Sequence, residues 1–176
     1  MTTVPMRVKS LNVARYAETF AEFVRRSLEY DQILSAIQGC VDRLPRDYAM
    51  LDVGAGTGEV IHALVKNARL RPYRYVAFEP NPAHFEALTR ATDNLGLPEV
   101  ELRQAPFDES VPLESCFDFV LFSHSLYWMK DPAKVFEHAV HRLKSGGTAM
   151  GILQGPYGVH TLLALYEPRF ERLTPM

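Results

Sequence analysis

The chain has few cysteines and no long apolar run, and these two features exclude several classes of protein. Its two cysteines, Cys40 and Cys116, lie far apart and form no CxxC pair. We therefore expect neither a disulfide scaffold nor a zinc or other metal site, and a reducing, cytoplasmic location. Residues 1–10 lack the apolar core of a signal peptide. No stretch approaches the roughly 18 uninterrupted apolar residues of a membrane span, so no membrane partner is expected.

The sequence also lacks an excess of charge of either sign, with a formal net charge of −2. Without a basic field, nucleic acid and anionic membranes are not expected as partners. Apolar residues make up 47% of the 176 residues, which is enough for one well-packed domain. This nearly neutral net charge is compatible with a small or cationic substrate.

The spacing of apolar residues changes near residue 46. Before it, residues 10–28 and 33–44 show helical spacing, and Pro45 ends the second helix. After it, apolar runs predict strands at 48–53, 74–78, 100–103, 117–122 and 148–153. The predicted intervening helices are 60–68, 82–95, 131–143 (closed by Gly146 and Gly147) and 158–166. This alternation predicts an α/β fold, with a Rossmann-like, doubly wound and mainly parallel sheet of about five strands.

Three glycines, Gly54, Gly56 and Gly58, follow the first predicted strand. Glycine lets a ligand approach the main chain, and the N-terminus of the next helix offers N–H groups to an anion. The spacing is GxGxG led by Asp52, whereas the dinucleotide fingerprint GxGxxG requires its third glycine where this chain has Glu59. The loop therefore predicts a ligand that carries an anionic group. Because the third glycine of the dinucleotide fingerprint is missing, an NAD(P)-dependent oxidoreductase is the less favoured function.

Glu79 ends the second predicted strand, roughly 20 residues after the glycine loop. A carboxylate at that place can accept hydrogen bonds from both hydroxyls of a ribose. Ligands of such sheets bind beyond the carboxyl ends of the strands, where the strand order reverses. Loop and acid together predict a ribose-containing cofactor. The alternatives without a ligand are that Gly54–Gly58 is only a tight turn and that Glu79 is only a solvated acid.

Asp52–Gly58 resembles motif I (D-x-G-x-G-x-G) of class I S-adenosyl-L-methionine (SAM)-dependent methyltransferases, and Leu143–Gly147 resembles the LKPGG segment before their fifth strand. The resemblance implies SAM as the cofactor and requires no metal. It places Asp108 near the adenine and Ser123 near the amino-acid end of the cofactor. The implied cofactor-binding residues are Asp52, Gly54, Gly56, Gly58, Glu79, His84, Asp108 and Ser123.

Two further segments resemble histamine N-methyltransferase: Tyr16–Phe23, continued by Ser27–Tyr30, and Leu126–Asp131. The chain also resembles the methyltransferase domain of ovothiol synthases, almost as closely. Both resemblances imply methylation of a nitrogen on a small imidazole or amine. Glu29 would bind the polar or cationic group of the substrate, and four aromatic residues would form its pocket: Tyr16, Phe20, Tyr127 and Trp128. The alternative is that these aromatics are core and Glu29 is a solvated acid.

The chain departs from these families by its length. Class I methyltransferases usually have seven strands, and there is room here for about five, the last two being missing. We expect a tail at 1–9, helices forming a substrate lid at 10–45, a truncated SAM-binding core at 46–170 and a tail at 171–176. Three outcomes stay open: a fragment, a homo-oligomer that pairs through the exposed edge at 148–153, or a SAM-binding protein without catalysis. The exact methyl acceptor is also left open.

Overall fold

The computed structural model describes residues 29–67, 71–113 and 116–153. The predicted helices at 10–28 and 158–166 lie outside these ranges. None of the described helices is long and apolar enough to cross a membrane. The elements follow in the order α2 (Glu29–Val41), β1 (Ala49–Val53), α3 (Glu59–Asn67), β2 (Arg74–Phe78), α4 (Pro82–Asp93), β3 (Glu99–Arg103), β4 (Phe117–Ser123), the 3-10 turn η1 (Leu126–Trp128), α5 (Pro132–Val140) and β5 (Leu143–Ile152).

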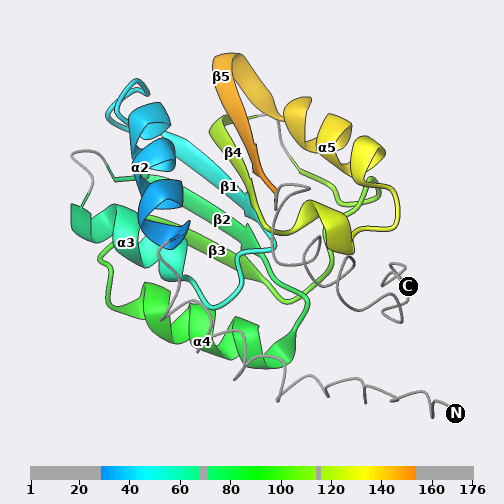
Figure 1. Ribbon diagram of the computed structural model, residues 1–176, viewed down its shortest axis with the longest axis horizontal. Coiled ribbons are helices and arrows are strands. Elements are labelled where there is room, and N and C mark those ends of the chain that lie inside the picture. The colour runs from blue at the N-terminus through cyan, green and yellow to red at the C-terminus, as the bar shows by residue number, and fades with distance from the viewer. Residues whose placement is uncertain (1–28, 68–70, 114–115, 154–176) are drawn as a thin grey trace, which may run out of the picture.

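The strands form one sheet in the order β3-β2-β1-β4-β5 (Figure 1). Every neighbouring pair is parallel, and Leu51 in β1 lies between Val76 of β2 and Val120 of β4. The strand order reverses between β1 and β4, which opens a crevice at their carboxyl ends. The predicted Rossmann-like α/β fold is confirmed.

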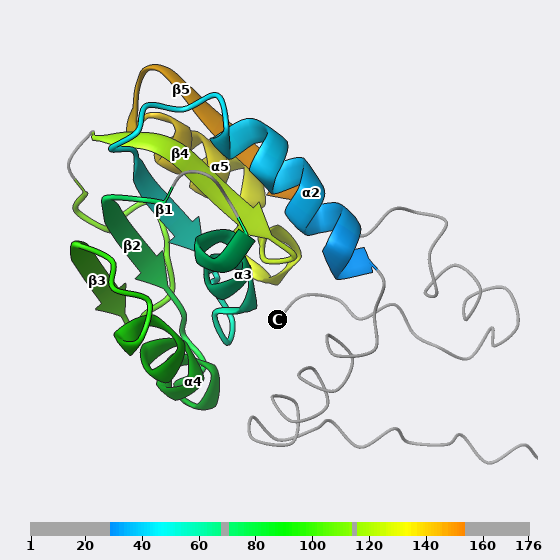
Figure 2. The same cartoon turned by 90° about the vertical axis from the view of Figure 1, so that its left-hand side faces the viewer.

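Helices cover both faces of the sheet because the strands are apolar on both sides. In β1, Met50 belongs to the core beneath α2, α3 and α4, and Leu51 belongs to the core beneath α5. Figures 1 and 2 show α2, α3 and α4 on one face and α5 on the other. The helix α2 contributes Ile33 and Ile37 to its core, so this part of the predicted lid also supports the sheet.

The predicted end of the helix at 131–143 is wrong. Helix α5 ends at Val140, and Leu143 already pairs with Phe117 as the first residue of β5. The next recorded pair joins Thr148 to Phe119, so residues 144–147 form a bulge. Gly146, with φ of 81°, provides the left-handed turn of this bulge and does not cap the helix.

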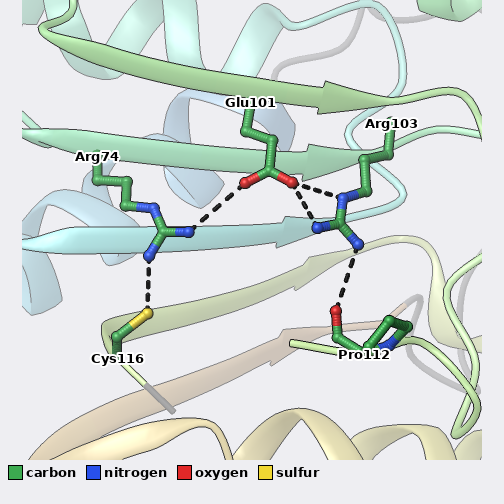
Figure 3. A network of polar contacts seen from close by, with 5 residues as sticks. All are labelled: Arg74, Glu101, Arg103, Pro112 and Cys116. Atoms are coloured by element: carbon green, nitrogen blue, oxygen red, sulfur yellow. Dashed lines mark hydrogen bonds and ion pairs between the residues drawn. The ribbon is translucent and has the colours of Figure 1, made fainter. Parts of the chain in front are cut away.

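A polar network covers β2 and the edge strand β3 on the α5 side of the sheet (Figure 3). The carboxylate of Glu101 accepts hydrogen bonds from Arg74 (3.5 Å) and from Nε of Arg103 (2.6 Å). Arg74 also donates to Sγ of Cys116 at 2.8 Å, and Arg103 donates to the carbonyl of Pro112 at 3.5 Å. The network thus ties the edge strand to the segment that leads from β3 into β4.

Candidate functional site

A cavity of about 910 Å³ lies at the carboxyl ends of β1, β2 and β4, where the strand order reverses. Its size falls within the range of roughly 300–1,000 Å³ that is usual for ligand sites. The predicted site residues that line it are Asp52, Gly54, Gly56, Glu79, His84, Asp108, Ser123, Tyr127 and Trp128. Tyr16 and Phe20 lie outside the described residues. Glu29 begins α2, and its side chain also lies outside the described part of the chain.

The glycine loop is shaped by close approach to neighbouring elements. Gly54, with φ of 76°, donates its N–H to the carbonyl of Phe78 at 2.8 Å. A Cβ on Gly54 would lie 2.5 Å from Cβ of Ser125, so no other residue fits there. Gly58 does not line the cavity; a Cβ there would lie about 3 Å from side-chain atoms of Leu88 and Ala91 on α4. Gly58 therefore allows α4 to pack against the loop.

Glu79, directly after β2, joins the glycine loop to the start of α4. One carboxylate oxygen accepts from the N–H of Gly56 and the other from the N–H of Asn81, both at 2.8 Å. Asn81 in turn caps α4 by accepting from the N–H groups of Ala83 and His84. Nδ1 of His84 lies 3.7 Å from Glu79. The carboxylate of Glu79, which was predicted to hold a ribose, thus links the backbone of the glycine loop to the residue that caps α4.

Asp52, the last but one residue of β1, is buried in the wall of the cavity. Its Oδ2 accepts a 2.9 Å hydrogen bond from the hydroxyl of Tyr75 on β2. Burial raises the pKa of Asp52 to about 7, the hydrogen bond from Tyr75 lowers it, and the charge of Glu79 raises it. The cavity therefore contains a carboxyl group that changes its charge near neutral pH.

Residues 106–110 form a further part of the cavity wall. Phe107 packs edge-on against Phe78 at 5.0 Å between ring centroids, and lies 5.6 Å from the ring of His138. Asp108 accepts hydrogen bonds from the N–H and hydroxyl of Ser110, and these lower its pKa. His138 contacts the carbonyl of Val111. Among the described residues, no three acidic, His or Cys side chains are grouped as metal ligands.

The segment after β4 supplies the aromatic rim. His124 has φ of 54°, a left-handed conformation that is uncommon for a residue other than glycine. The rings of Tyr127 and Trp128 meet edge-on, 5.5 Å apart, and their exposed fractions are 39% and 61%. Both line the cavity, so they are available for contact with a ligand. The predicted aromatic segment is thus placed beside the glycine loop.

Sequence reasoning did not single out several polar residues in or beside this site, among them Asn81, Tyr75 and Ser125. The pair Asn81-Pro82 is a recognisable helix start in the sequence and could have revealed the cap. Tyr75 reaches Asp52 only because β1 and β2 are adjacent and parallel, which no local pattern reveals. Nothing in the sequence around Ser125 indicates that it lies against Gly54.

Comparison with known proteins agrees with this architecture. Residues 51–151 match the family model described as "Methyltransferase domain". A solved SAM-dependent methyltransferase from Clostridium acetobutylicum is similar, with a TM-score of 0.66 at 19% identity, over 85% of this chain and 61% of that one. A second structure of this kind, from Methanococcus maripaludis, has a TM-score of 0.65 at 20% identity, over 93% of this chain and 76% of that one.

A methyltransferase from Geobacter sulfurreducens, solved with S-adenosyl-L-homocysteine, has a TM-score of 0.54 at 14% identity, over 67% of this chain and 46% of that one. The structure of a Haloferax volcanii complex between the Trm112 methyltransferase activator and a methyltransferase has a TM-score of 0.60 at 21% identity, over 77% of this chain and 56% of that one. The chain thus spans little more than half the length of several structures that it matches. No curated protein matches it significantly.

Proposed function

The chain belongs to the methyltransferase-domain family, and from this premise we propose that it transfers a methyl group from SAM to a nitrogen of a small imidazole or amine. The family match confirms the predicted methyltransferase class, and the likeness to a methyltransferase solved with S-adenosyl-L-homocysteine supports the predicted cofactor. The nature of the acceptor, the roles of individual residues and the lid at 10–45 belong to the proposal.

The cavity fits a cofactor with a ribose in its middle. Glu79 stands at the end of β2 with its carboxylate in the lining, and a Cβ on Gly56 would meet nothing within 4 Å, so the loop leaves open space there. In this proposal Asp108, which lines the cavity, contacts the adenine, and Ser123 at the end of β4 contacts the amino-acid end. Asp52 and His84 complete the proposed cofactor-binding set beside Glu79.

One observation carries the choice of acceptor: Tyr127 and Trp128 stand exposed at the cavity, directly after β4. Aromatic faces attract cations and stack on flat rings, which favours a small imidazole or amine. The ionisable lining is also mainly acidic, with Glu59, Glu109 and Asp131 in addition to the acids named above, against Lys130 and Lys134. Such a lining favours a positively charged ligand.

The chemistry asks little of the protein beyond alignment. When bound, SAM supplies a methyl group activated by its positively charged sulfur. The acceptor must present a neutral nitrogen in line with the sulfur–carbon bond, so that the nitrogen–carbon bond forms as that bond breaks and its electron pair stays on sulfur. Tyr127 and Trp128 would orient the acceptor and exclude water, and the proton lost by its nitrogen passes to solvent.

The proposal is tested first by calorimetry with S-adenosylhomocysteine, and with NAD as the control ligand. We expect saturable binding of S-adenosylhomocysteine alone, weakened at least tenfold by Glu79→Ala, because Glu79 holds both the ribose and the loop. Binding of NAD instead would favour the oxidoreductase and contradict the proposal.

Methyl transfer is then measured with imidazole, histamine and histidine as acceptors, beside a phenol and a carboxylic acid. Trp128→Ala should raise KM for the nitrogen acceptors several-fold and leave the affinity for S-adenosylhomocysteine unchanged. Tyr73→Ala, an exposed aromatic outside the cavity lining, is the matched control. Binding of S-adenosylhomocysteine without transfer to any nitrogen would favour the alternative of a SAM-binding protein without catalysis.

A protein partner at the sheet edge is a second part of the proposal. In the described part of the chain, β5 pairs only with β4 and β3 pairs only with β2, so each presents an open edge. A second copy of the chain that pairs through β5 would cover one edge. Sedimentation velocity should then show a dimer, and a monomer at high concentration would contradict this pairing.

A further inference from the structure

Residues 104–113 follow β3 without a helix or strand of their own. Five of them, residues 106–110, line the cavity. A segment without regular structure has few backbone hydrogen bonds, so its position depends on the contacts that other elements make with it. The contacts of this segment therefore determine the shape of one wall of the cavity.

His138, on α5, makes a polar contact with this segment across 27 positions of the sequence. Nε2 of its ring lies 3.2 Å from the carbonyl oxygen of Val111. A carbonyl oxygen can only accept, so the contact is a hydrogen bond when Nε2 carries a proton. The side chain of His138 is half-buried, which strengthens such a bond relative to one in water.

The same ring also packs against the other end of the stretch from Phe107 to Val111. The ring centroids of His138 and Phe107 lie 5.6 Å apart, with an angle of 50° between the ring planes. Between these two contacts, the N–H of Val111 donates to the carbonyl of Asp108 at 3.1 Å and closes a turn. His138 thus holds both ends of a short stretch whose middle lines the cavity.

Phe107 connects this stretch to the part of the cavity that is proposed for the ribose. Its side chain is buried, and its ring packs edge-on against Phe78 at 5.0 Å between centroids. Phe78 directly precedes Glu79, whose carboxylate is the proposed partner of the ribose hydroxyls. A ribose at Glu79 would therefore place the adenosine part of the cofactor beside the stretch that His138 holds.

We propose that His138 is a positioning residue of the cofactor site, a role that rests on the proposed function. His138 does not line the cavity, so it acts through Phe107 and Val111 and does not touch the ligand. Its hydrogen bond keeps the wall in the shape that accepts adenosine, so that less binding free energy is lost in ordering this segment. The opposing interpretation is that His138 only packs on α5 and has no effect on the ligand.

The test measures two ligands on the purified full chain by calorimetry: S-adenosylhomocysteine, and 5′-methylthioadenosine, which keeps the adenosine and lacks the amino-acid group. His138→Leu removes the donor and should weaken the binding of both by about three- to ten-fold, the effect of one hydrogen bond. His138→Gln should bind both within about twofold of wild type, because its amide can donate from nearly the same place as Nε2.

Two further variants complete the comparison. His138→Asn, whose amide is one methylene shorter than that of Gln, should weaken the binding of both ligands as His138→Leu does. His62→Leu, at an exposed position of α3 outside the cavity lining, is the matched control and should change neither affinity. Hydrogen exchange of the unliganded chain should accelerate at 106–111 in His138→Leu and His138→Asn, and it should match wild type in His138→Gln.

Each other outcome overturns the proposal. Equal weakening by His138→Leu and His138→Gln would give the ring a packing role only, and wild-type affinity in His138→Leu would mean that the wall does not depend on it. Weakening of S-adenosylhomocysteine alone would place the effect at the amino-acid end of the cofactor. If the wild-type chain binds neither ligand, the proposed function fails and this inference with it, whereas unchanged exchange at 106–111 together with normal cofactor binding overturns this inference alone.

Discussion

The hydroxyl of Tyr75 on β2 donates a hydrogen bond to Oδ2 of Asp52 on the adjacent strand β1, at 2.9 Å. Both side chains are buried, beside the wall of the proposed cofactor site. The pair places a carboxyl group with a pKa of about 7 inside the fold, mainly because burial disfavours its charged form.

Stability should therefore fall as pH rises through the range in which only the unfolded chain loses the Asp52 proton. That range runs from the ordinary pKa of 3.8 to about 7. Within it the folded chain holds more protons than the unfolded chain, so the free energy of unfolding declines by up to about 1.4 kcal/mol per pH unit, and it levels off above pH 7. Urea unfolding of wild type and Asp52→Asn at pH 5, 6, 7 and 8 measures this. The Asn variant should lack that decline; an equal decline in both would contradict the assignment.

Tyr75→Phe should shift the pH dependence of the free energy of unfolding to higher pH. The hydrogen bond from Tyr75 lowers the pKa of Asp52, so its removal leaves burial and the charge of Glu79 to raise that pKa further. The pH at which the free energy of unfolding stops declining should therefore increase. Tyr73→Phe, at an exposed position, serves as the control. A profile that stays in place or moves downward would show that the hydrogen bond does not favour the charged form.

Gly54→Ala should destabilise the chain more than Gly56→Ala. Both glycines have positive φ, at 76° and 60°, so each substitution costs about 1 kcal/mol of backbone strain. At position 54 the added Cβ also lies 2.5 Å from Cβ of Ser125, whereas at position 56 it meets nothing within 4 Å. Thermal unfolding of the two variants isolates the steric part, and Gly54→Ala with Ser125→Gly should recover that part only. Equal melting temperatures of the two single variants would contradict the close contact.

Arg103→Met should loosen the segment 104–113, which includes the cavity-lining residues 106–110, with little loss of global stability. Arg103 joins Glu101 to the carbonyl of Pro112 and lies 5.2 Å from the Phe78 ring. The Arg103–Glu101 pair is partly exposed, at 34% and 38%, so its net contribution is about 1 kcal/mol or less. Hydrogen exchange should accelerate in this segment and not in Arg90→Met, which breaks the exposed pair with Glu86 on α4. Uniform acceleration across the sheet would point to global destabilisation instead.

Asp118→Ala should cost about 1–3 kcal/mol, because Oδ2 of Asp118 accepts from the buried N–H of Ala49 at 2.8 Å and the substitution removes this acceptor. Lys144→Met removes the other partner of the same oxygen, which lies 2.7 Å away. The lysine is nearly half exposed, so its loss should change stability by about 1 kcal/mol or less. Urea unfolding of both variants gives the comparison. A larger loss of unfolding free energy in Lys144→Met than in Asp118→Ala would contradict this ranking of the two contacts.

Local features of the sequence were enough to find the described strands and the glycine loop. Apolar runs located all five described strands, and the spacing of Gly54, Gly56 and Gly58 after Asp52 identified the class of cofactor. These features are short-range, since strand period and turn glycines act within a few residues. The same local rule failed at Gly146 and Gly147, where pairing of Leu143 with Phe117 extends the strand and the glycines form a bulge.

The sequence by itself thus determined the α/β fold, the family and the position of the glycine loop after β1, because these depend on patterns that each segment carries alone. Tertiary structure decided which side chains meet: Tyr75 with Asp52, Glu79 with Gly56, and Ser125 with Gly54. Those contacts join residues that are 23 or more positions apart. They depend on the order of the strands in the sheet, which brings the ends of β2, β1 and β4 to one edge and which no single segment encodes.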